Sequence, residues 1–181
     1  MIKLDIPVKQ YSFFERVKRK LKAKTIIRPY FDEHQCIFVH VPKVAGTSMK
    51  NTLFPNTSGP GHKSAMAYYL DNPDKFERYF VFAFVRNPYD RLVSAYNYLM
   101  QGGKGGEADL IFRDSYMTDY ADFSDFVKHG LTRVEIVSYW HLMPQYLYLI
   151  NYEGKIIVDY IGYFENIDAD FSKVAHKLGM N

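Results

Sequence analysis

The chain of 181 residues contains a single cysteine, Cys36. One cysteine can form neither a disulfide framework nor a zinc site with several thiolate ligands, and its place at the start of an apolar run predicts a buried thiol. No apolar run approaches the roughly 20 residues that a membrane-spanning helix needs, and the N-terminus lacks the apolar core of a signal peptide. We therefore expect a cytoplasmic location.

The positive charge of the chain is concentrated at its N-terminus. The net charge is +3, yet residues 1–30 contain nine Lys or Arg and two acids, while the remainder contains 14 basic and 18 acidic residues. Within 9–24, Phe13, Phe14, Val17 and Leu21 lie on one side of a basic amphipathic helix. This helix could make peripheral contact with an anionic membrane or a polyanionic acceptor, or it could pack its apolar stripe on the domain. We expect 1–35 to be a basic extension and 36–181 to be a single domain.

The segment from Val39 to Ser48 predicts a phosphate-binding turn. A hydrophobic strand leads into Lys43, followed by Ala45, Gly46, Thr47 and Ser48 at the start of a helix. Free backbone N–H groups at a helix start attract anions. Gly46 allows close approach of the backbone, Lys43 supplies a full charge, and the two hydroxyls can cap the helix or bind phosphate. A simple strand-to-helix turn with a surface lysine is the alternative.

A second junction of the same kind follows the apolar run 79–85, which is typical of a strand buried on both faces. It ends at Arg86. Asn87 fits the N-cap of the next helix, and Pro88 its first position. We expect Arg86 to point into the crevice at the carboxyl end of the sheet and Ser94 to reach the same anion. Alternatively, Arg86 pairs with a surface acid such as Asp90, and Ser94 is a small packing residue.

These motifs resemble those of the PAPS-dependent sulfotransferases, in particular the carbohydrate type that includes heparan sulfate 2-O-sulfotransferases and small bacterial relatives. The resemblance rests on V-P-K-V-A-G-T-S and R-N-P-Y-D-R-L-V-S-A-Y, and it covers roughly 35–180. Three further segments agree with it: Gly61–Ala65, Met143–Gln145 and Asp159–Asn166. Two features depart from the family pattern. Tyr163 stands where Arg or Lys is common, and the chain ends at Asn181, which implies a C-terminally short domain without the contacts of a longer tail.

The resemblance implies roles for the two motifs. The first loop, with Lys43 and residues 45–48, would hold the 5′-phosphosulfate of the donor PAPS, while Arg86 and Ser94 would hold its 3′-phosphate, also in the product PAP. Sulfuryl transfer needs positioning and charge neutralisation, so we expect Lys43 to stabilise the leaving phosphate and no metal to be required.

The acceptor hydroxyl must lose a proton, and histidine suits that task near neutral pH. His62 is the candidate base, and the family places a catalytic histidine in a comparable position. A loop or capping role for His62 is the alternative. We interpret His40 as shaping the loop from beneath, and His34, His129, His141 and His176 as surface or partly packed residues.

The resemblance implies transfer to a hydroxyl of a carbohydrate or glycolipid. Two other functions remain open: a non-catalytic module that binds nucleotides or polyanions, and a P-loop kinase, although G-K-[ST] and an acidic magnesium ligand are not evident. Nucleic-acid binding is not expected, because no RNP, zinc or helix-turn-helix pattern accompanies the basic stretch.

Alternating strands and helices predict an α/β fold of P-loop-like type, with a small, mainly parallel sheet flanked by helices. We expect strands at 36–41 and 79–85 and an extended segment near 156–162. Residues 101–106 predict a glycine-rich break that could serve as a lid. The expected helices lie at 10–24, 46–54, 64–70, 73–78, 88–101, 122–129, 132–140 and 168–178.

Overall fold

The computed structural model describes residues 25–180; the helix predicted at 10–24 lies outside the described residues. Three parallel strands form the sheet in the order β1-β2-β3, namely β1 (Cys36–Val39), β2 (Phe80–Val85) and β3 (Tyr160–Tyr163). In the register, Val39 pairs with Ala83, and Ala83 pairs with Ile161. The predicted parallel α/β architecture is therefore confirmed, with β2 as the central strand.

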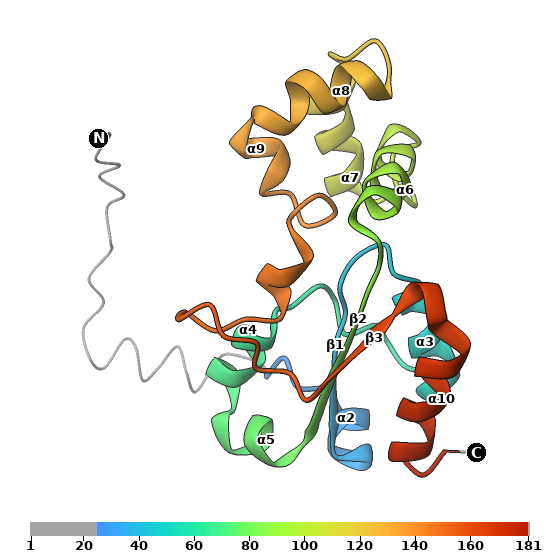
Figure 1. Cartoon of the computed structure of the whole chain (residues 1–181), viewed down its shortest axis with the longest axis vertical. Helices are drawn as coiled ribbons and strands as arrows, with labels where there is room; N and C mark the ends of the chain where they lie inside the picture. Colours follow the sequence, from blue (N-terminus) through green and yellow to red (C-terminus); the bar gives the residue numbers. More distant parts are fainter. Residues whose placement is uncertain (1–24, 181) are drawn as a thin grey trace.

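Helices flank the sheet on both sides (Figure 1). One side carries α3 (Gly46–Leu53) and α10 (Ile167–Lys177), and the other carries α4 (Ala65–Asp71) and α5 (Pro73–Arg78). Short helix α2 (Pro29–His34) precedes β1 and was not predicted. Its Tyr30 and Phe31 lie on the N-terminal side of the boundary predicted at residue 36, and both are buried in the core around the sheet.

A second group of helices lies beyond the carboxyl ends of the strands (Figure 1). It contains α6 (Pro88–Met100), α7 (Glu107–Phe112), a π-helical segment at Arg113–Met117, α8 (Phe123–His129) and α9 (Val134–Val137). These helices enclose their own hydrophobic core around Leu99, Phe126 and Ile136. The sequence predicted α6 and α8 but missed α7, and it extended α9 too far, to 132–140. Within the described residues, no helix is long and apolar enough to cross a membrane.

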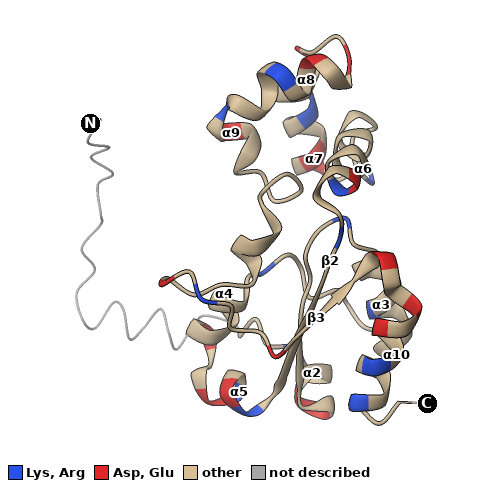
Figure 2. Ribbon diagram, in the orientation of Figure 1, with Lys and Arg blue, Asp and Glu red and all other residues tan. Residues whose placement is uncertain are grey.

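The second junction has the local structure that the sequence predicts. The side chain of Asn87 caps α6 by accepting hydrogen bonds from the backbone N–H groups of Tyr89 and Asp90, and Pro88 occupies the first turn. β2 is buried along its central residues. The chain therefore passes from the sheet core into the helical group at Arg86, and basic residues lie at this transition (Figure 2).

Candidate functional site

Both predicted junctions lie at the same edge of the sheet. β1 and β2 are adjacent parallel strands, so the loop after Val39 and the loop after Val85 leave the sheet side by side. Open α/β sheets bind ligands in the crevice at this end of their strands. The topology therefore places the Lys43 loop next to the Arg86 junction.

The backbone of the first loop combines left-handed residues with the start of a right-handed helix. Lys43 and Ala45 both adopt the left-handed conformation, with φ of 68° and 61°. Ala45 is the N-cap residue of α3, and Gly46 begins the right-handed helix. Successive left- and right-handed residues direct neighbouring N–H groups toward one point, where an anion can bind. The N-cap residue is Ala45, which forms no side-chain cap bond, so the predicted option of a cap by Thr47 or Ser48 is wrong. Both hydroxyls lie on exposed residues and are available for other contacts.

His40 explains why the first loop contains glycine. A Cβ atom at residue 46 would collide with the imidazole ring of His40. This close packing confirms that His40 lies beneath the loop, and it makes side-chain space rather than backbone freedom the reason for Gly46. Burial, followed by the neighbouring His62, lowers the pKa of His40 to about 3, so this ring is neutral at physiological pH.

A cavity of about 370 Å³ opens above this loop. Within it, the Lys43 ammonium lies 3.9 Å from the ring centroid of Tyr98. Burial lowers the pKa of Lys43, and the charges of Lys104 and Arg86 lower it further. A bound anion would relieve this repulsion, so the cavity is electrostatically suited to one. It is lined by His40, Lys43, Ala45, Gly46, Thr47, His62, Tyr98, Lys104 and His141.

His62, the predicted base, lines the same cavity as Lys43. Its Nδ1 atom lies 3.1 Å from the backbone oxygen of His40. Because a carbonyl oxygen only accepts hydrogen bonds, we assign the proton to Nδ1, which leaves the lone pair on Nε2 free to take a proton. Burial lowers the pKa of His62, which keeps the ring neutral near pH 7. The geometry therefore suits a general base.

His141 is a site residue that sequence reasoning missed. The interpretation of this residue as surface or partly packed is wrong, because it is only 6% exposed and its ring lies 5.5 Å from that of His62. Burial lowers its pKa to about 4, and its Nδ1 atom is buried without a hydrogen-bond partner in the described structure. Its position two residues before the Met143–Gln145 motif was the available signal.

Tyr98 and Lys104 were also missed. Tyr98 is a half-buried residue of α6 that lines the cavity, and Lys104 belongs to the glycine-rich segment 101–106. Positive φ angles at Gly102, Gly103 and Gly105 turn this segment back on itself, and Lys104 thereby lines the cavity. The predicted break is thus a turn that brings a second cation close to Lys43.

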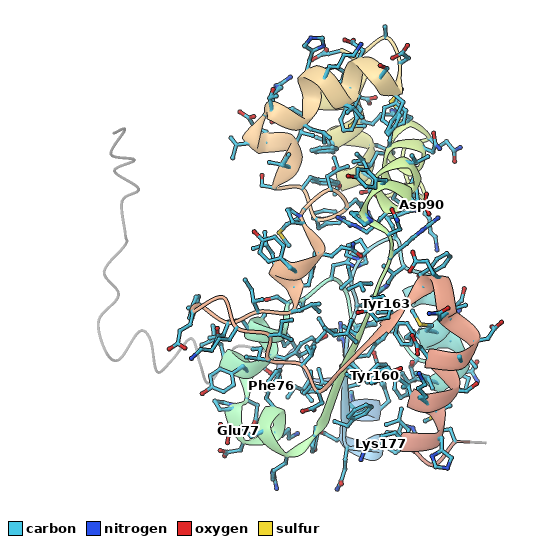
Figure 3. All side chains as sticks on the ribbon, viewed as in Figure 1. Phe76, Glu77, Asp90, Tyr160, Tyr163 and Lys177 are labelled. Carbon is cyan, nitrogen blue, oxygen red and sulfur yellow. The ribbon has the colours of Figure 1, made fainter. Side chains whose placement is uncertain are left out.

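Arg86 lines a second, larger cavity of about 730 Å³ rather than the one that contains Lys43. Its guanidinium carbon lies 4.4 Å from the ring centroid of Phe164, and its Nε is buried without a hydrogen-bond partner in the described structure. An ion pair with Asp90 is not among the contacts of residues 25–180, so that alternative reading of Arg86 is not supported. Tyr163, at the end of β3, also borders this cavity. Figure 3 labels Tyr163 together with Asp90, which lies in the first turn of α6.

Two other motifs hold the Arg86 junction in place. The Gln145 side chain accepts a hydrogen bond from the Arg86 N–H (2.9 Å) and donates one to its carbonyl oxygen (2.7 Å). Glu165 accepts from the N–H of Asn87 at 2.5 Å. The M-P-Q and F-E-N segments therefore fix the direction in which Arg86 leaves the sheet.

Two predicted binding residues lie outside both cavities. Ser94 is half-buried on α6, and Ser48 is exposed on α3. Neither borders the Lys43 cavity or the Arg86 cavity. Their roles in phosphate binding stay predictions.

Arg91 links the loop that contains Lys43 to the segment 141–143. It is 5% exposed, and its guanidinium donates hydrogen bonds to the backbone oxygens of His141 (3.1 Å) and Met143 (2.6 Å), with longer contacts to those of Pro42 (3.4 Å) and Leu142 (3.5 Å). Burial lowers its pKa. One side chain of α6 therefore ties the residue before Lys43 to the segment that carries His141.

Replacing Arg91 with methionine is expected to lower the free energy of unfolding by about 3 kcal/mol, because buried carbonyl groups lose their donors. In a chain of this length that loss lowers the Tm by roughly 6–12 °C. Arg78→Met is the matched control: Arg78 is exposed on α5 and donates to Asp74 within its own helix. Calorimetry measures both, and equal Tm values for the two variants would contradict the linking role of Arg91.

The sequence of this chain is similar to those of known sulfotransferases. The model of the sulfotransferase family matches residues 30–181. Carbohydrate sulfotransferase 14 of Danio rerio is 26% identical over 187 aligned residues, which cover 88% of this chain and 50% of that protein. An uncharacterized protein of Archaeoglobus fulgidus is 36% identical over 106 residues, covering 58% of this chain and 72% of that protein.

The chain thus spans about half of the length of the zebrafish relative. No solved structure matches it at a comparable level of significance. The family match includes both strand-to-helix junctions, the Lys43 cavity and the segments that hold Arg86 in place. The chain belongs to the sulfotransferase family.

Proposed function

We propose that this protein transfers the sulfuryl group of PAPS to a hydroxyl of a carbohydrate or glycolipid. The observation that carries the proposal is the presence of a cation, Lys43, and a neutral histidine with a free Nε2, His62, in one cavity above an anion-binding loop. The name of the zebrafish relative supports a carbohydrate acceptor.

The donor would span the two cavities. The N–H groups of the Ala45–Thr47 turn and the Lys43 ammonium suit the 5′-phosphosulfate. Arg86, with its unpartnered buried Nε, suits the 3′-phosphate. Because β1 and β2 are neighbours, both ends of one nucleotide could be bound at the same edge of the sheet.

In the proposed reaction, the acceptor oxygen attacks the sulfur atom in line as the bond from sulfur to the 5′-phosphate oxygen breaks. The proton of the hydroxyl passes to Nε2 of His62. The electron pair of the broken bond stays on the phosphate, which leaves as PAP, and Lys43 neutralises the charge that develops there. Lys104 adds positive charge at the cavity wall.

Binding of PAP tests the donor assignment. PAP at 100 times its Kd is expected to stabilise the protein by about 2.7 kcal/mol, and AMP, which lacks the 3′-phosphate, should stabilise it less at equal concentration. Differential scanning fluorimetry measures both shifts, with ATP as a further comparison.

The 3′-phosphate contact is isolated by Arg86→Gln, which should abolish the difference between PAP and AMP, while exposed Arg78→Gln should preserve it. Equal shifts with PAP and AMP in the unsubstituted protein would refute a 3′-phosphate site. Transfer itself is measured with radiolabelled PAPS and a panel of polysaccharides and glycolipids. Binding of PAP without transfer to any acceptor would favour a non-catalytic nucleotide-binding module.

A further inference from the structure

A buried carboxylate lies behind the wall of the Lys43 cavity. Asp109, on α7, is 8% exposed. Its Oδ2 accepts a hydrogen bond from the Tyr98 hydroxyl at 3.0 Å, and its Oδ1 accepts one from the Tyr139 hydroxyl at 2.6 Å. The same Oδ1 lies 3.5 Å from Nε2 of His141. Among residues 25–180 it has no Lys or Arg partner within ion-pair distance.

Two of the residues that contact Asp109, Tyr98 and His141, line the cavity. The face of the Tyr98 ring contacts the Lys43 ammonium at 3.9 Å. A carboxylate that accepts a hydrogen bond from the phenol increases the electron density of the ring and strengthens its attraction for the ammonium. His141 packs against Tyr98 with 4.8 Å between ring centroids and against His62 with 5.5 Å. Asp109 therefore contacts the two residues that lie against Lys43 and His62.

The glycine-rich turn rests on the same carboxylate. Gly103 has a φ of +66°, and a Cβ atom at this residue would collide with the Asp109 side chain. Lys104 follows directly and lines the cavity. The position of this second cation is thus also set by the packing against Asp109.

Asp109 supplies negative charge to a site that is otherwise basic. The groups that face His62 are His40 from the end of β1, Lys43 from the first loop, and His141 from the turn after α9. Burial lowers the pKa of His62, and the charge of Asp109 acts in the opposite direction and raises it. Asp109 likewise opposes the effect of burial on His141 and on Lys43.

We propose that Asp109 is a positioning residue of the Lys43 cavity, which fixes Tyr98 beneath Lys43 and His141 beside His62 and balances the charge when His62 takes a proton. The kinetic part of this proposal rests on the proposed sulfuryl transfer. The structural and electrostatic parts concern the protein alone and can be measured without a donor.

The test compares Asp109→Asn with Tyr139→Phe. The asparagine keeps the shape of the side chain but removes its charge. The phenylalanine removes the hydrogen bond from residue 139 to Oδ1 of the carboxylate and leaves the bond from Tyr98 to Oδ2 in place. Asp109→Asn is expected to lower kcat about tenfold, to leave the KM for PAPS roughly unchanged, and to move the acid limb of the rate profile to lower pH. Tyr139→Phe should lower the Tm and leave the acid limb in place. Identical pH profiles for the two variants would mean that Asp109 only stabilises the fold, and would overturn the proposal.

A second readout is independent of activity. The imidazole ¹³Cε1 signals of His62 and His141, followed by NMR without any ligand, are expected to titrate at lower pH in Asp109→Asn than in the unsubstituted protein. Unchanged titrations would overturn the proposal even if transfer is active, and shifted titrations would support it even if no transfer is found. If Asp109→Asn fails to fold, Tyr98→Phe keeps the ring beneath Lys43 and removes only its bond to Asp109; it should lower kcat severalfold at constant KM, and an unchanged kcat would overturn the proposal.

Discussion

Replacement of Lys43 by alanine is expected to lower turnover with PAPS by about 100- to 1000-fold, the loss typical of removing one charge-stabilising group from an active site. Lys43 is the cation of the first loop, and its ammonium extends over Tyr98 into the cavity. Its contribution is needed most when negative charge develops on the leaving phosphate. We therefore expect the larger effect in kcat and a smaller one in the KM for PAPS.

The control for this prediction is Lys155→Ala. Lys155 lies at an exposed turn and pairs with exposed Glu153, so its removal should leave turnover unchanged. Circular dichroism and Tm of Lys43→Ala should resemble those of the unsubstituted protein, because the half-buried ammonium forms no ion pair among residues 25–180. A rate for Lys43→Ala within about threefold of the control would remove Lys43 from the chemistry.

Replacement of His62 by alanine is expected to lower turnover by about 100-fold or more, the typical contribution of a positioned general base. Binding of PAP, measured by calorimetry, should change little, since His62 faces the reacting hydroxyl in the proposed mechanism rather than the nucleotide. His34→Ala is a suitable comparison, because His34 lies in α2 and borders neither cavity. Loss of PAP binding in His62→Ala would assign His62 to donor binding instead of proton transfer.

The pH dependence follows from the same residue. Burial lowers the pKa of His62, so the neutral form that can accept a proton persists to lower pH than in an ordinary histidine. The rate is expected to be constant through neutral pH and to fall only on the acid side of the ordinary histidine pKa of about 6.5. In His62→Ala this acid limb should disappear from the residual rate.

The parts of the site that lie at strand ends could be predicted from sequence. An apolar run that ends in Arg86-Asn87-Pro88 contains its own strand, cap and first helical residue, and the structure has each of them. Lys43 and Gly46 follow the preceding strand in the same way. Such junctions are readable because the signals that form them are local.

The wall formed by the helical group could not be predicted in this way. His141, Tyr98 and Lys104 reach the cavity only because the helices of their group pack around one core and Arg91 holds the turn after α9 against the first loop. Apart from the closeness of His141 to the Met143–Gln145 motif, the sequence around these residues carries no local signal, since a histidine or tyrosine in isolation is typical of ordinary packing as well. The role of Asp109 could not be predicted either, because its helix α7 was missed. This helix has six residues and follows a glycine-rich turn, so it is too short to show a clear periodicity.

His40 contacts both the anion-binding loop and the proposed base. Its ring occupies the space beneath Gly46, while its carbonyl oxygen accepts a hydrogen bond from Nδ1 of His62. The side chain of His40 thus supports the anion-binding loop, and its backbone carbonyl orients the imidazole of His62. Any larger side chain at Gly46 displaces the His40 ring, and through it the imidazole that must meet the acceptor, so donor recognition and acceptor activation cannot be altered independently in this loop.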